Sequence, residues 1–85
     1  MFGEDESREA IIAVAAYVNG EEEQFEIVRG DVFNNLIYVR DCLTHPGTGI
    51  PHAYVYSLNS KRVFAVAGEV DPITALATIA NVDGA

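Results

Sequence analysis

The last third of the chain contains the pattern that most restricts the fold. His52–Leu58 (HAYVYSL) and Arg62–Ala67 (RVFAVA) are rich in the β-branched and aromatic side chains that strands favour. Leu58–Lys61 between them is a turn sequence. Asp71-Pro72 then predicts the start of a helix, because Asp can cap free N–H groups and proline at the first helical position loses no hydrogen bond. We therefore predict strand, turn, strand and helix in this region.

The first half permits a similar interpretation. Ile11–Val18 is apolar, Asn19-Gly20 is a strong hairpin signal, and Gln24–Arg29 alternates as a strand does. Val32–Leu43 has apolar residues near helical spacing, which predicts a helix. The alternative is a helix over residues 7–18, capped by Ser7, because the alanines of this segment favour helix. Periodicity alone does not decide between the two for a run this short.

A possible internal repeat favours the strand. The two halves align at an offset of about 40 residues, which pairs Asn19 with Asn59 and Asp31 with Asp71. We predict an α+β fold over residues 1–85, a single small acidic domain with a two-layer, four-stranded, mainly antiparallel sheet and two helices on one face. The elements would form a tandem ββα-ββα pseudo-repeat. In the alternative, an N-terminal helix replaces the first strand and the order is αβαββα.

The acidic residues are concentrated near the N-terminus. The chain of 85 residues has a net charge of −8, and residues 1–31 contain nine acidic and two basic residues. This charge argues against direct binding of nucleic acid, whose phosphates require Lys and Arg. The longest apolar run, Ala10–Val18, has nine residues and is too short to span a membrane. With no basic leader and a single cysteine, we expect no membrane partner and a cytoplasmic location.

One cluster of reactive side chains surrounds the Pro- and Gly-rich link Thr44–Pro51. Cys42, His45 and His52 are weak candidates for metal ligands, because their spacing matches no zinc site and a structural site needs four ligands. Cys42 would lie at the C-terminal end of a helix, where the dipole disfavours a reactive thiolate. We therefore predict no catalytic residue, no metal and no cofactor, and a protein that is not an enzyme.

The predicted sheet leaves apolar surface without a cover. Ile11–Val18 and Arg62–Ala67 are apolar on both faces, whereas helices on one side would cover one face. Tyr54 and Tyr56 share a face of their strand, and tyrosines are enriched at protein interfaces. A second copy or another protein would cover that face, so we predict a homo-oligomer or a heteromeric assembly.

These features predict a small acidic protein–protein interaction module that is regulatory or inhibitory. Its partner-binding residues would be four acidic side chains that attract a basic surface and two tyrosines that pack against it: Glu21, Glu22, Glu23, Glu26, Tyr54 and Tyr56. One alternative is a structural subunit of a larger assembly. Another is an inhibitor that mimics nucleic acid with its carboxylates, although a triplet at a hairpin tip does not supply the ordered rows of charge that such a mimic needs.

Overall fold

The chain folds as an antiparallel sheet with a helix at each end of the sequence. The structure, a computed structural model, describes residues 2–44 and 51–83. In order, its elements are α1 (Glu4–Val18), the 3-10 helix η1 (Glu22–Gln24), β1 (Phe25–Asp31), β2 (Leu36–Thr44), β3 (Pro51–Ser57), β4 (Val63–Val66) and α2 (Pro72–Asp83). Each strand pairs antiparallel with the next, in the order β1-β2-β3-β4. The predicted α+β class, with a four-stranded antiparallel sheet and two helices, is confirmed.

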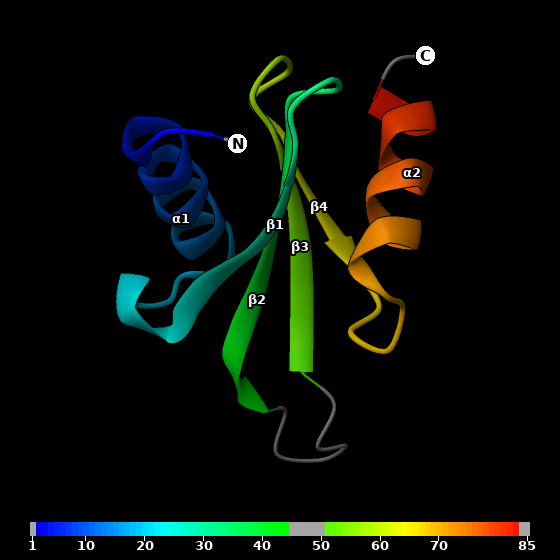
Figure 1. The fold of residues 1–85 in the computed structure, drawn as a ribbon. Coiled ribbons are helices and arrows are strands. Elements are labelled where there is room, and N and C mark those ends of the chain that lie inside the picture. Colours follow the sequence, from blue (N-terminus) through cyan, green and yellow to red (C-terminus); the bar gives the residue numbers. More distant parts are fainter. Residues whose placement is uncertain (1, 45–50, 84–85) are drawn as a thin grey trace.

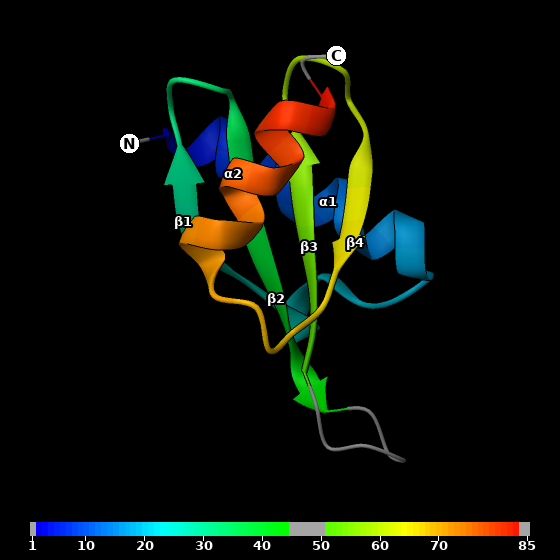
Figure 2. The same cartoon turned by 90° about the vertical axis from the view of Figure 1, so that its right-hand side faces the viewer.

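The two helices lie on opposite faces of the sheet. Figure 1 shows α1 on one side of the strands and α2 on the other, and Figure 2 shows α2 in front of the sheet with α1 behind it. The expectation of two helices on one face was wrong, and three layers form where two were predicted. Each face of the sheet therefore has its own apolar core.

The central strand β2 explains this arrangement. Ile37 and Val39 pack in the core under α1, whereas Leu36 and Tyr38 pack in the core under α2, and all four are fully buried. A strand that is apolar on both faces needs a cover on each side. Of the two segments predicted to be apolar strands, Ile11–Val18 is a helix, whereas Arg62–Ala67 contains β4, which has apolar side chains in both cores. Helices α1 and α2 supply one cover each for the sheet.

Helix α1 occupies the segment that was predicted as the first strand. Ala10, Val14 and Ala15 are buried against the sheet, at helical spacing. The helix starts before the suggested cap Ser7, because the backbone N–H of Gly3 donates to the carboxylate of Glu6 at 3.0 Å. The alternative prediction was thus right about the helix and wrong about its first residue.

The C-terminal third agrees with its prediction. Strands β3 and β4 form a hairpin, and α2 begins at Pro72. Asp71 caps the helix, since its carboxylate accepts hydrogen bonds from the N–H of Thr74 at 2.9 Å and from its hydroxyl at 2.8 Å. In the turn between β3 and β4, the residue with a positive φ is Lys61, at 61°, and not Asn59.

The pseudo-repeat was wrong. Residues 11–18 are helical while residues 51–57 form a strand, and the predicted helix Val32–Leu43 is largely strand β2. Because Val32–Leu43 is not a helix, the alternative order αβαββα was also wrong. Most of the link Thr44–Pro51 lies outside the described residues, and its two end residues belong to β2 and β3.

Candidate functional site

A groove runs between α2 and the end of the β1–β2 hairpin. Its volume is about 710 Å³. One wall consists of residues 29–34, at the end of β1 and in the turn that follows. The other wall is a face of α2 with mainly apolar side chains: Ile73, Leu76, Ala77, Ala80 and Asn81. The groove forms because α2 packs over β2 and β3 and leaves the edge strand β1 partly uncovered on this face.

Large apolar side chains at this groove are exposed to solvent. The side chain of Phe33 is 98% exposed, that of Ile73 is 61% exposed and that of Val32 is 49% exposed. All three line the groove. Single exposed apolar residues are common, but several of them lining one hollow are typical of an interaction surface. We name Val32, Phe33 and Ile73 the apolar rim.

Hydrogen bonds hold the turn that carries Phe33. The carboxylate of Asp31 accepts from the backbone N–H of Asn34 at 3.3 Å and from its side-chain amide at 2.9 Å. Asn35 has a left-handed φ of 55°, and its amide donates to Asn59 in the β3–β4 turn at 3.2 Å. The aromatic ring therefore projects from a backbone that is already ordered, which lowers the entropy lost on binding.

The groove continues toward the β3–β4 turn. A second hollow of about 320 Å³ shares Phe33 and Ala80 with the first and reaches Ser60 and Asp83. Asp83 in the last turn of α2 accepts hydrogen bonds from the hydroxyls of Ser57 and Ser60, both at 2.7 Å. These bonds lower the pKa of the Asp83 carboxyl, with Ser60 contributing most. They also join the end of α2 to β3 and to the β3–β4 turn.

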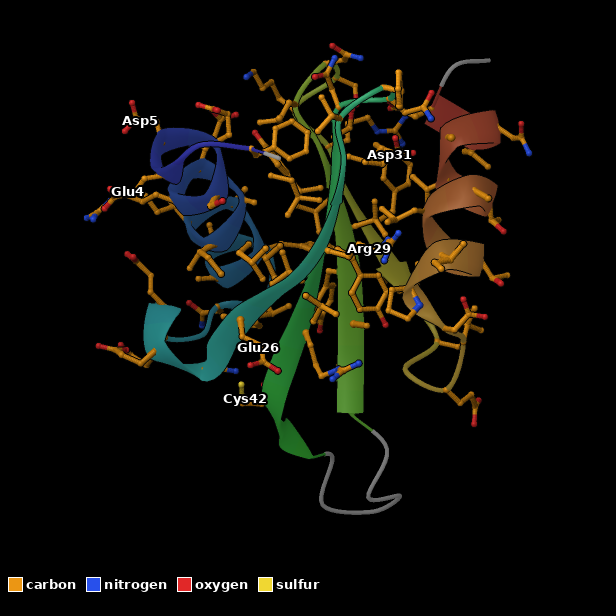
Figure 3. All side chains as sticks on the ribbon, in the orientation of Figure 1. Glu4, Asp5, Glu26, Arg29, Asp31 and Cys42 are labelled. Atoms are coloured by element: carbon orange, nitrogen blue, oxygen red, sulfur yellow. The ribbon has the colours of Figure 1, made fainter. Side chains whose placement is uncertain are left out.

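The acidic residues lie mainly on the opposite side of the molecule. Seven of the thirteen are in α1 or in the segment of η1: Glu4, Asp5, Glu6, Glu9, Glu21, Glu22 and Glu23. Figure 3 shows Glu4 and Asp5 on α1, and Arg29 and Asp31 on the side of the sheet that faces α2. We name the α1 and η1 side the acidic layer. The sheet therefore separates most of the negative charge from the groove.

The structure brings together three of the four predicted acidic partner residues. Glu21, Glu22 and Glu23 are exposed and, with Ile11, line a hollow of about 450 Å³. Glu26 is exposed on β1 and pairs in register with Arg40 of β2. The triplet lies between α1 and β1 and not at a hairpin tip, because the preceding segment is a helix.

The predicted tyrosines are in the core. Tyr54 is 7% exposed and Tyr56 is 3% exposed, and both pack under α1. The ring of Tyr54 has edge-to-face contacts with Tyr17 and Phe25, with centroids 6.0 and 6.3 Å apart. The open, tyrosine-bearing sheet face that the sequence suggested is therefore covered by α1, and these two side chains are not available to a partner.

Tyr56 also belongs to a polar cluster that joins α1 to the β3–β4 hairpin. Its hydroxyl donates to the carboxylate of Glu9 at 2.6 Å, and the ammonium group of Lys61 lies 2.8 Å from the same oxygen. Burial, followed by the contact with Glu9, raises the pKa of Tyr56 to about 12. The hydrogen bond from Lys61, followed by that from Tyr56, lowers the pKa of Glu9. Each group is paired inside the protein, so this cluster serves to position α1.

The weak metal candidates are not grouped in the described part of the chain. Cys42 and His52 are exposed, on β2 and β3, and Figure 3 shows Cys42 near the end of β2 that is remote from the groove. His45 lies outside the described residues. Among residues 2–44 and 51–83, no three His, Cys, Asp or Glu side chains lie close enough to hold a metal ion.

Sequence reasoning missed the groove. Val32–Asn35 was predicted as the start of the helix Val32–Leu43, with Phe33 on its apolar face. A signal was present, because Asp and two Asn residues around a short apolar pair are typical turn residues. A Val-Phe pair inside a turn has few local neighbours to bury it, which points to an exposed aromatic ring.

Fold and groove together define a small α+β protein in which a four-stranded antiparallel meander lies between two helices. Comparison of the chain with protein-family models, with curated proteins and with solved structures found no match. Neither helix of the described residues is long and apolar enough to cross a membrane.

Proposed function

We propose that this protein is a small, acidic, non-enzymatic protein–protein interaction module that binds through the groove between α2 and the β1–β2 turn. The observation that carries this proposal is the 98% exposed Phe33 beside a groove whose α2 wall is mainly apolar. Burying one phenylalanine side chain is favourable by about 2–3 kcal/mol. The free protein does not gain this free energy, because the ring of Phe33 is in water. Aromatic residues that fill a pocket on the partner typically dominate binding energy.

The acidic layer supports a second element of the proposal. Glu21, Glu22 and Glu23 line a hollow together with Ile11. A basic side chain in this hollow would contact carboxylates with its charged end and the apolar side chain of Ile11 with its methylene groups. Charges of one sign on one side of a molecule mainly accelerate encounter with an oppositely charged protein. We therefore propose that the acidic layer is a second contact surface, separate from the groove and on the other side of the sheet, which attracts proteins with a basic surface.

Site-specific photo-crosslinking tests the groove. Phe33 is replaced by a photoreactive phenylalanine analogue in the cells that make the protein, and Ile12 is replaced in a matched control. Ile12 is 44% exposed and lies on α1, on the far side of the sheet. We expect a discrete protein adduct from position 33 and none of the same mass from position 12. Absence of any adduct at position 33, or the same adduct at both positions, would overturn the proposal.

A further inference from the structure

The apolar rim and the groove lie side by side on one surface of the chain. Phe33 projects from the turn, and the α2 wall beside it is formed by small or apolar side chains such as Ala77 and Ala80. A surface that presents both a projecting aromatic ring and an apolar hollow is self-complementary. Two copies related by a two-fold axis then contact each other with the same patch, each ring in the other's groove.

Charge distribution favours this face for contact between identical chains. Each copy has a net charge of −8, and the acidic layer holds seven of its acidic residues. Contact through α1 would bring two such layers together, which costs free energy by like-charge repulsion. Contact through the groove puts two four-stranded sheets, one from each copy, between the acidic layers. Among the described surfaces, the groove face therefore lets two copies approach with less repulsion than the α1 face does.

The groove also contains a complementary pair of charges. Arg29 and Asp31 are two residues apart on β1, both line the groove, and both project from the sheet face toward α2. A two-fold axis between them places Arg29 of one copy beside Asp31 of the other, twice in the same interface. Such pairing at an interface contributes orientation and selectivity as well as attraction.

The available apolar area limits the size of such an interface. Two phenylalanines contribute about 300–500 Å² of buried surface. A specific interface buries at least about 1,200 Å² in total, so a dimer that buries Phe33, Val32, Ile73 and the groove walls lies at or below this limit. An interface at this lower limit is a transient one, with a dissociation constant in the micromolar range or weaker.

We propose that the occupant of the groove is a second copy of this chain, in a two-fold dimer in which each Phe33 enters the groove between α2 and the β1–β2 turn of its partner. This inference rests on the proposed function, because it names the partner for the same groove. It differs from the dimer expected from the sequence, which would have formed through an open sheet face bearing Tyr54 and Tyr56.

Sedimentation velocity over protein concentrations from the low micromolar to the submillimolar range tests the dimer. We expect the mass to rise from 9.2 kDa to twice that value with concentration. Phe33→Ser should weaken association by at least about tenfold, while Ile12→Ser should leave it unchanged. Arg29→Glu should also weaken it. A wild-type chain that stays monomeric, a Phe33→Ser chain that associates like the wild type, or unchanged association of Arg29→Glu would overturn the inference.

Isotope-filtered NMR of a mixture of labelled and unlabelled chains tests the contact itself. We expect intermolecular cross-peaks between the ring protons of Phe33 and the methyl groups of Ala77 and Ile73. A dimer without these cross-peaks would overturn the proposed geometry. The crosslinking experiment separates the two proposals: an adduct at twice the chain mass supports both. An adduct with a different protein overturns the second copy alone, and no adduct at position 33 overturns both.

Discussion

The hydroxyl of Tyr56 in β3 donates a 2.6 Å hydrogen bond to the carboxylate of Glu9 in α1, 47 residues earlier in the chain. The phenol is almost fully buried, whereas the carboxylate also contacts the exposed Lys61. This bond therefore joins the N-terminal helix to a central strand at the boundary between core and solvent. Tyr38, in the neighbouring strand β2, is also buried, but its hydroxyl has no hydrogen-bond partner among the described residues.

The two buried tyrosines should respond in opposite ways to removal of the hydroxyl. Tyr56→Phe removes a hydrogen bond to a charged group and should destabilise the protein by about 1–2 kcal/mol. Tyr38→Phe removes an unsatisfied buried polar atom and should be neutral or stabilising by up to about 1 kcal/mol. Urea unfolding of both variants measures the difference. Equal destabilisation by the two substitutions would contradict the contrast between the hydroxyls.

The Tyr56 contact also predicts a loss of stability at high pH. The pKa of this phenol is raised from 10.0 to about 12 in the folded protein, so the unfolded chain releases the proton first. The stabilising contribution is complete below pH 10 and is lost as the pH rises toward 12. Urea unfolding between pH 9 and pH 12 should show this decline, and Tyr56→Phe should reduce its slope. The pKa of Tyr54 is also raised, and this residue remains in the variant. Its ionisation should therefore cause part of the decline in stability that Tyr56→Phe still shows.

Asp83 should stabilise the end of α2 although a carboxylate is unfavourable near the C-terminus of a helix. Asp83→Ala leaves the buried hydroxyl of Ser57 without this acceptor and should cost about 1–3 kcal/mol. The pKa of Asp83 is lower in the folded protein than its unfolded value of 3.8. The carboxylate therefore stabilises the fold fully above pH 3.8, and this stabilisation is lost as the pH falls through the pKa of the folded state. In a double-mutant cycle, Ser57→Ala and Asp83→Ala should be non-additive. Additive losses would show that the two side chains act independently.

Asn19 should behave as a helix C-cap. It has a left-handed φ of 56°, and the N–H groups of Asn19 and Gly20 donate to Ala16 and Ala15 at 3.4 and 2.9 Å. Asn19→Gly should be neutral or slightly stabilising, because glycine adopts this φ without strain. Asn19→Val should cost about 1–2 kcal/mol, because a β-branched residue disfavours positive φ. Thermal unfolding followed by circular dichroism ranks the three proteins, and a valine variant as stable as the wild type would contradict this role.

Neutralising three glutamates of the acidic layer should leave the groove dimer intact. The triple variant Glu21→Gln, Glu22→Gln, Glu23→Gln should dimerise with an association constant within about twofold of the wild-type value. Exposed charges that are farther apart than the Debye length, about 10 Å at 0.1 M salt, are screened from each other. The same variant should bind less to a basic probe such as polylysine at low salt. Sedimentation velocity and a salt titration measure the two effects. A dimer strengthened severalfold by these substitutions would point to contact through α1 instead.

The C-terminal third was predictable because its signals are local. A hairpin turn between two β-rich segments and an Asp-Pro cap before a helical pattern depend on neighbours in sequence, and each appears in the structure. The four strands and two α-helices of residues 2–44 and 51–83 also agree in number with the prediction. The segments assigned to the first strand and the first helix were exchanged: residues 4–18 form the helix and residues 36–44 form the strand.

Asn19-Gly20 illustrates the cause of this exchange. A type I′ hairpin turn and a helix C-cap both need residues that accept positive φ, so the same dipeptide marks either structure. Similarly, the apolar residues of β2 are consecutive because both faces of this strand are buried, and such a run has no period that separates strand from helix. Local sequence therefore determined where elements end, but not which kind of element preceded the end.

By itself, the sequence determined the class of the fold, the hairpin and helix of the last third, and the concentration of acidic residues before residue 32. Tertiary structure alone decided that α1 and α2 cover opposite faces, because that choice depends on which side of β2 each apolar side chain occupies. It also decided that Tyr54 and Tyr56 are buried and that Phe33 is exposed. Burial is a property of contacts between distant segments, whereas composition and turn signals belong to the local chain, so the groove became visible only when α2 was placed beside the β1–β2 turn.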